Sequence, residues 1–154
     1  MTTTTGAGER ERAVLQRMTE WKEAFEAKDV DGIMTFYADG DGFSAFDLMP
    51  PIQFRGGDMW RQNWIGFFAA WAGAPSLEFA DMEVLVSDRI AVVRLLTRLT
   101  GEMGGQHLDM WVRQTNCFRL ADEQWLMFHD HVSFPTDFTN GQSLMALSPD
   151  KPFG

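Results

Sequence analysis

Apolar residues follow a helical period near the start of the chain. Between residues 9 and 28 they recur at spacings of four, three and four positions and form one helical stripe: Val14, Met18, Trp21 and Phe25. Asp29 is suited to cap a second short helix, whose apolar side consists of Ile33, Met34, Phe36 and Tyr37. The pattern therefore predicts two consecutive helices, followed by a turn over residues 38–42.

A group of large aromatic residues predicts a third helix. It begins after Gly56 and Gly57, and its rings recur at helical spacing: Trp60, Trp64, Phe67, Phe68 and Trp71. Gly73 and Pro75 are expected to end this helix. Before it, residues 43–48 are typical of a short strand, which the following prolines end.

After Pro75 the period changes to that of strands. Four segments are rich in Val, Leu, Thr, Phe and Trp, and turn residues separate them: residues 77–86, 90–100, 107–120 and 124–134. The short connections favour antiparallel neighbours. We therefore expect an α+β fold, in which a cone-shaped, curved antiparallel sheet packs on three N-terminal helices and encloses a pocket.

The chain divides into three parts on this basis. Residues 1–8 are small and polar and are predicted to be a disordered leader. Residues 9–138 form the domain, and residues 139–154 form a C-terminal tail. One domain is the expectation for 154 residues.

Composition narrows the class of partner. The chain has 13 Lys and Arg against 22 Asp and Glu, a net charge of −9, and no basic cluster that would bind nucleic acid. No apolar run is long enough for a membrane helix, and no export signal precedes residue 9, so we expect a cytoplasmic protein without a membrane partner. The 6 Trp, 13 Phe and 10 Met residues favour a pocket for an apolar or aromatic small molecule.

Two segments resemble a known family. Residues 27–39, AKDVDGIMTFYAD, resemble the second-helix signature of the nuclear transport factor 2-like superfamily. Residues 125–133, WLMFHDHVS, resemble the closing strand of its SnoaL-like branch. The resemblance implies the cone fold and a homodimer that pairs through the outer sheet face. It does not fix an activity, because this fold hosts isomerases, cyclases, dehydratases, hydrolases and binding modules.

Ketosteroid isomerase is a relative within that branch, and only part of its machinery is matched. Asp47 falls near the place of its general-base aspartate, allowing a shift of two residues. The oxyanion tyrosine would fall at Glu20 or Trp21, and the acid that donates a hydrogen bond would fall near Asn116. Steroid isomerisation is therefore not expected.

Asp47 is the first candidate for chemistry. Apolar residues surround it in sequence, and a carboxyl group in an apolar pocket has a raised pKa and can serve as acid or base near neutral pH. The alternative is an exposed aspartate that caps the Pro50-Pro51 turn.

The segment His129-Asp130-His131 is the second candidate. On a regular strand His129 and His131 share one face with Met127, and Asp130 lies on the other face with Val132. Inward histidines would offer a proton shuttle, and an inward Asp130 would be a lone acid among apolar groups. The sequence does not choose between these faces. No third metal ligand is evident nearby, so no metal site is predicted.

The remaining candidates are pocket residues: Tyr37, Trp60, Trp64, Phe68, Arg113 and Asn116. An inward Arg113 would bind a carboxylate, and Asn116 would stabilise an oxyanion. The predicted function is a small-molecule enzyme of isomerase, cyclase or dehydratase type that uses acid–base chemistry without a cofactor. The alternative is a non-catalytic ligand-binding or association module of the same fold.

Overall fold

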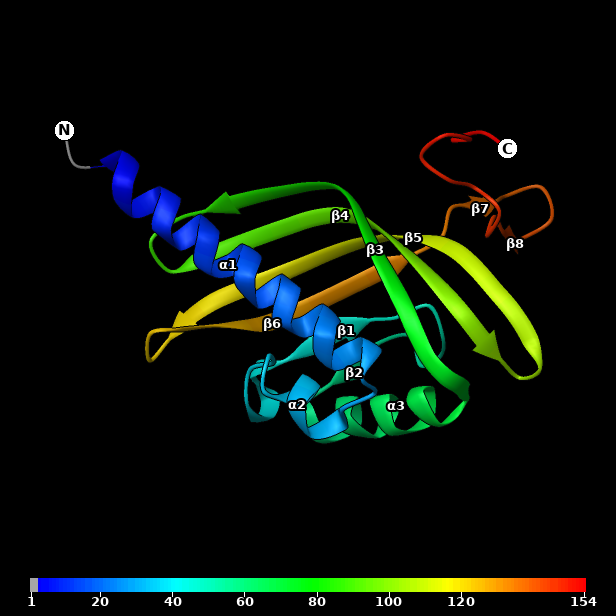
Figure 1. Cartoon of the computed structure of the whole chain (residues 1–154), viewed down its shortest axis with the longest axis horizontal. Coiled ribbons are helices and arrows are strands. Elements are labelled where there is room, and N and C mark those ends of the chain that lie inside the picture. Colours follow the sequence, from blue (N-terminus) through cyan, green and yellow to red (C-terminus); the bar gives the residue numbers. More distant parts are fainter. Residues whose placement is uncertain (1–2) are drawn as a thin grey trace.

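The computed structural model describes residues 3–154. Three helices lie on one side of a long curved sheet (Figure 1): α1 (Thr3–Glu26), α2 (Val30–Met34) and α3 (Gly57–Ala69). A short 3₁₀ turn, η1 (Gly40–Gly42), connects α2 to the first strand. Asp29 caps α2 as predicted, because its Oδ1 accepts a hydrogen bond from the Gly32 N–H at 2.9 Å.

The sheet has six strands in the order β2-β1-β6-β5-β4-β3. Their bounds are β1 (Ser44–Phe46), β2 (Phe54–Arg55), β3 (Trp71–Val86), β4 (Ile90–Met103), β5 (Gln106–Ala121) and β6 (Gln124–Ser133). The expectation of a purely antiparallel sheet is wrong at one place, since β1 runs parallel to β6. A parallel pair needs a long connection, and here the chain between the two strands builds α3 and four further strands.

The third helix ends earlier than the sequence predicts. Its last residue is Ala69, and Gly73 and Pro75 lie inside β3 instead of ending the helix. They fall in an irregular stretch where the pairing of β3 with β4 shifts between Ala72 and Ser76. A bulged strand tolerates both residue types, because its unpaired positions need no ladder hydrogen bond.

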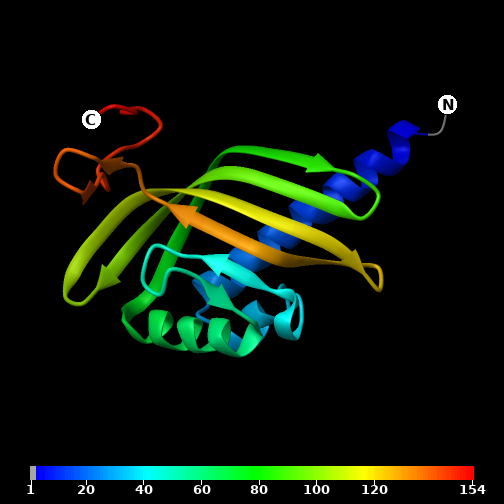
Figure 2. The ribbon, with the colours of Figure 1, turned by 180° about the vertical axis from the view of Figure 1, so that it is seen from behind.

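The sheet curls around the helices without closing, and Figure 2 shows this from behind. Its concave inner face packs against α1 and α3 and buries one continuous apolar core. The largest fully buried core side chains are Phe43, Phe118, Met18, Ile33, Met127, Val14 and Val93. In the described part of the chain no helix has the length and apolar character needed to span a membrane.

Both ends of the chain differ from a simple leader and tail. The predicted leader at residues 1–8 overlaps α1, which begins at Thr3, while Met1 and Thr2 lie outside the described residues. A helix propagates easily once its first turns have formed, so α1 continues past its packed stripe. The tail forms a small hairpin from β7 (Thr136–Asp137) and β8 (Gln142–Ser143) and then lies against the outer face of the sheet.

Candidate active site

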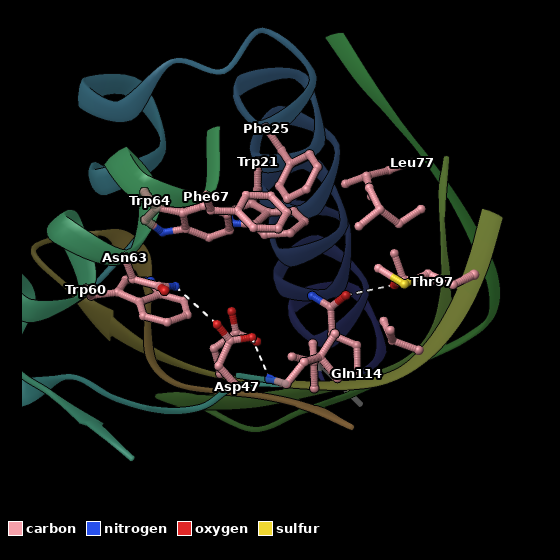
Figure 3. Close-up of a pocket in the computed structure, with 16 residues that line it drawn as sticks. Trp21, Phe25, Asp47, Trp60, Asn63, Trp64, Phe67, Leu77, Thr97 and Gln114 are labelled. Atoms are coloured by element: carbon pink, nitrogen blue, oxygen red, sulfur yellow. Dashed lines mark hydrogen bonds between the residues drawn. The ribbon is translucent and has the colours of Figure 1, made fainter. Parts of the chain in front are cut away.

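A cavity of about 90 Å³ lies between the helices and the inner face of the sheet (Figure 3). Aromatic side chains from α1 and α3 form one wall: Trp21, Phe25, Trp60, Trp64 and Phe67. Aliphatic side chains from the sheet form the opposite wall: Leu77, Leu99, Met110, Val112 and Val132. The polar groups that reach this space are few, and they are Asp47, Asn63, Thr97, Gln114 and Asp130.

The aromatic wall is packed from behind. Trp60 and Trp64 line the cavity as predicted, with ring centroids 5.3 Å apart in an edge-to-face arrangement. Phe68 was predicted to line it too, but it lies behind Trp64, stacked at 5.1 Å, while Phe67 reaches the cavity. Neighbouring positions on a helix point in directions about 100° apart, so only one of these two phenylalanines can face inward.

Asp47 reaches the cavity from the end of β1. Ala45 on β1 pairs with Asp130 on β6, and Asp47 follows Ala45 by two positions and so falls on the same side. Its Oδ2 accepts a hydrogen bond from Asn63 Nδ2 at 3.1 Å, and its Oδ1 accepts one from the Leu48 N–H at 2.8 Å. Burial raises the pKa of Asp47, and the two donors partly offset that rise.

Asp130 is the most buried acid of the site, with 5 % of its surface exposed. Burial and the charge of nearby Asp47 raise its pKa from 3.8 to about 7, against the hydrogen bonds that the Asn116 side chain and the His131 backbone N–H donate. The side-chain bond runs from Asn116 Nδ2 to Asp130 Oδ1 over 3.0 Å. At neutral pH this carboxyl group therefore exchanges between its protonated and ionised forms.

A β-bulge decides which face of β6 meets the cavity. Cys117 pairs with His129 and the next residue, Phe118, pairs with Met127, which leaves Phe128 without a partner position. The extra residue resets the alternation, so that Met127 and Asp130 both point inward. The regular alternation assumed from the sequence placed Met127 with the histidines, and that grouping is wrong.

The two histidines lie on the outer face of the sheet, away from the cavity. His129 Nδ1 lies 2.8 Å from Ser44 Oγ, and the ring of Phe46 packs between His129 and His131, with centroids at 4.8 and 5.4 Å. Burial and the neighbouring His131 lower the pKa of His129. The structure therefore does not bring the histidines to the acids.

Arg113 and Tyr37 also lie outside the cavity. Arg113 alternates with the inward Val112 and Gln114, so it points outward and donates hydrogen bonds to Ser133 Oγ at 3.1 Å and the Phe134 carbonyl at 3.0 Å. Tyr37 is buried beside the cavity.

The Tyr37 hydroxyl oxygen accepts a hydrogen bond from Trp21 Nε1 at 2.8 Å. Burial, together with the charge of Asp130, raises the pKa of Tyr37 well above its ordinary value. Asn116, predicted as a pocket residue, does not line the cavity itself, but it makes hydrogen bonds to two residues that do, Asp130 and Gln114.

Three polar residues of the cavity were not singled out from the sequence. Asn63 lies one helical turn from Trp60 and Phe67, and that spacing was a usable signal. Thr97 and Gln114 lie on the inner faces of β4 and β5, where their alternation with outward arginines indicates the same side. Within residues 3–154, no group of three His, Cys, Asp or Glu side chains is placed to hold a metal ion.

Comparison with solved structures identifies similar folds. A nuclear transport factor 2-like protein of unknown function from Pseudomonas putida matches with a TM-score of 0.84 and 26 % identity, covering 92 % of this chain and 98 % of that one. A candidate dehydratase of the same superfamily from Streptomyces avermitilis matches with a TM-score of 0.74 and 17 % identity, covering 82 % and 97 %. A candidate calcium/calmodulin-dependent protein kinase II association domain from Xanthomonas campestris matches with a TM-score of 0.69 and 18 % identity, covering 79 % and 85 %.

The sequence comparisons agree with the fold. No curated protein matches the sequence. The model of the SnoaL-like domain matches residues 14–137, which span all three helices and the whole six-stranded sheet except the first turns of α1. The chain therefore belongs to the SnoaL-like domain family, within the nuclear transport factor 2-like superfamily.

Proposed function

We propose that the cavity is the active site of an enzyme that moves protons on a small neutral molecule, with Asp130 as the acid and Asp47 as the base. The observation that supports this most is the pairing of two carboxyl groups in one aromatic-walled cavity. One of them, Asp130, has its pKa raised to about 7 by burial and by its neighbour. Groups that titrate near the working pH are efficient proton donors and acceptors.

The two acids have different environments, which favours different roles. Asp47 is the less buried group, and Asn63 and the Leu48 N–H both donate hydrogen bonds to it. These contacts favour its ionised form, and its charge in turn favours the protonated form of Asp130. The pair therefore offers one base and one acid at neutral pH.

The lining supports a neutral, apolar substrate. Among the described lining residues there is no Lys, Arg or His, so the site offers no countercharge to an anion. Rings and aliphatic side chains form most of its surface, and apolar ligands gain by burial against them. The volume of about 90 Å³ admits only a small ring or a short part of a longer molecule.

The chemistry needs no group beyond these acids. Asp47 removes a proton from a carbon next to a carbonyl group, and the C–H electrons form a carbon–carbon double bond. The carbonyl oxygen takes the proton of Asp130, which converts the ketone to its enol. Return of a proton at another carbon gives an isomer. Alternatively, Asp47 removes the proton next to the carbonyl group, the C–H electrons form a carbon–carbon double bond, and the bond to a β-hydroxyl group breaks. The hydroxyl oxygen takes the proton of Asp130 and leaves as water, as expected of a dehydratase.

Hydrogen–deuterium exchange tests the proposal without a known substrate. The protein is incubated in D₂O with small neutral ketones, including cyclohexanone and acetophenone, and NMR measures deuterium at the carbon next to the carbonyl group. The wild-type protein should accelerate exchange, and Asp47→Asn and Asp130→Asn should each reduce it by about 10²-fold or more. Asp88→Asn is the matched control, because the Asp88 side chain is 89 % exposed.

The alternative, a ligand-binding or association module, gives a different result. In that case the ketones raise the melting temperature of the wild-type protein but exchange no faster than in buffer. Binding would then survive both Asp47→Asn and Asp130→Asn. That outcome would contradict the catalytic proposal while leaving the cavity as a binding site.

A further inference from the structure

A row of buried polar side chains crosses the inner face of the sheet and ends at Asp130. Thr97 Oγ1 donates to Gln114 Oε1 at 2.7 Å, and Gln114 Nε2 donates to Asn116 Oδ1 at 2.9 Å. Asn116 Nδ2 then donates to Asp130 Oδ1 at 3.0 Å. All four residues are at most 5 % exposed. The row crosses three strands, since Thr97 lies on β4, Gln114 and Asn116 on β5, and Asp130 on β6.

The hydrogen bonds all run in one direction, toward the acid. A second contact fixes this direction, because Asn116 Nδ2 also donates to the sulfur of Met127 at 3.4 Å. The two N–H bonds of the Asn116 amide are thus both used, and its oxygen is left to accept from Gln114. At the other end of the row, the Thr97 hydroxyl satisfies the oxygen of the Gln114 amide (Figure 3).

No positively charged group of the described chain stabilises the ionised form of Asp130, so the hydrogen bond from Asn116 has a large influence on its pKa. The acids and titratable groups that act on it or respond to its charge are Asp47, Tyr37 and Cys117, and each is neutral or negative at neutral pH. Among the side chains of residues 8–154, Asn116 alone donates a hydrogen bond to Asp130. A donor held in place favours the ionised carboxylate, so loss of its orientation should make Asp130 harder to ionise.

We propose that Thr97 and Gln114 are positioning residues that hold the Asn116 amide with its N–H toward Asp130 Oδ1, so that the exchangeable proton of Asp130 is carried on Oδ2. Asn116 donates to Oδ1 at 3.0 Å, the His131 backbone also donates to this carboxyl group, and Asp130 lines the cavity. A role of this arrangement in catalysis rests on the proposed function. The expected effect of Thr97 on the pKa of Asp130 is independent of that function.

The test is a titration of Asp130 followed by NMR of protein labelled with ¹³C at the aspartate carboxyl carbons. Thr97→Val keeps the shape of the side chain but removes the hydroxyl donor. We expect it to raise the pKa of Asp130 by about half a unit to one unit, although Thr97 does not touch that residue. Thr97→Ser should restore the wild-type titration. Thr115→Val is the matched control, because Thr115 lies on the outer face opposite His131.

A double variant tests whether Thr97 acts through Asn116. Asn116→Leu alone should raise the pKa of Asp130 further than Thr97→Val does, and adding Thr97→Val to it should cause no additional shift. An unchanged titration in Thr97→Val, or an equal shift from Thr97→Val with and without Asn116→Leu, would overturn the proposal. If Thr97→Val fails to fold, Thr97→Ala and the Thr97→Ser rescue supply the same comparison.

The proposed enzymatic function and the proposed positioning role can be rejected independently of each other. Absence of ketone exchange with a shifted Asp130 titration in Thr97→Val would reject the enzymatic function and keep the positioning role. Exchange that depends on Asp130, together with an unmoved titration in Thr97→Val, would keep the function and reject the positioning role.

Discussion

Met127 and Asp130 lie on the same inward face of β6, although a regular strand would place them on opposite faces. The bulge at Phe128 causes this, because it inserts one residue into β6 opposite Cys117 and Phe118. Both inward side chains then contact the amide of Asn116, Asp130 through an oxygen and Met127 through its sulfur. The bulge therefore has two consequences. It directs Asp130 into the protein interior, and it places Met127 where its sulfur helps to orient the Asn116 amide.

Asp130 should make stability fall as pH rises. Its pKa is 3.8 in the unfolded chain and about 7 in the folded protein, so the folded state holds the proton more tightly. Between these values the unfolded state has already lost the proton, and stability falls until the folded group is ionised above pH 7. The shift corresponds to roughly 4 kcal/mol. Urea unfolding at a series of pH values between 4 and 8.5 measures this change in the free energy of unfolding.

Asp130→Asn should remove most of that pH dependence. The Asn side chain accepts the Asn116 hydrogen bond through its amide oxygen and carries no charge, so the variant should be more stable than the wild type at pH 8 while losing exchange activity. Asp88→Asn should keep the wild-type slope. An unchanged slope in Asp130→Asn would show that Asp130 does not titrate in this range.

Asn63→Leu should raise the pKa of Asp47. The variant removes the Nδ2 donor at 3.1 Å and leaves the Leu48 N–H as the remaining donor to this carboxylate. If Asp47 is the base, the acidic limb of the exchange activity moves to higher pH by a fraction of a unit to about one unit. The pH profile of ketone exchange measures this. Gln62→Leu, on an exposed neighbouring position of α3, should leave the profile unchanged.

Tyr37→Phe should destabilise the fold by about 1–3 kcal/mol, because it leaves the buried Trp21 N–H without an acceptor. A double-mutant cycle with Trp21→Phe isolates this hydrogen bond from the loss of indole packing. Chemical denaturation of the four proteins gives the coupling energy. A coupling energy near zero would mean that the hydrogen bond does not stabilise the folded state.

Gly101→Ala should also destabilise the fold. Gly101 has a φ of 149°, and a Cβ atom there would lie 2.8 Å from the Trp71 ring and 3.4 Å from the Pro75 backbone. We expect a loss of about 1–3 kcal/mol in unfolding free energy. Gly66→Ala is the opposite control, because nothing lies within 4 Å of its Cβ position on α3 and alanine favours helix. It should stabilise by about 0.5–1 kcal/mol.

Substitution of the outer-face histidines should leave proton chemistry intact. His129→Asn and His131→Asn alter the outer face, where Ser44 and Phe46 contact these rings, and they leave the cavity lining unchanged. Ketone exchange should therefore stay within about twofold of the wild type. A loss comparable with that of Asp130→Asn would place the histidines in the proton path and contradict their outward orientation.

The three helices and the four long strands could be predicted from the sequence. Apolar residues at helical spacing form the stripes that pack against the sheet, as with Trp21 and Phe25 on α1 and Trp60 and Trp64 on α3. The buried face of such a helix follows from the period of its apolar side chains. The alternation along β4 likewise puts Thr97 on the same side as the buried Leu95 and Leu99. These features are local, so they can be read from neighbouring residues.

The arrangement of the candidate site could not be predicted, because it depends on contacts between distant segments. The side of the sheet on which Asp130 lies depends on a bulge in the pairing of β6 with β5. No residue type near Phe128 indicates that bulge. The meeting of Asp47 with Asp130 depends on β1 pairing in parallel with β6, a contact between segments far apart in the sequence. The titration of Asp130 follows from both, because desolvation and charge act through space and not along the chain.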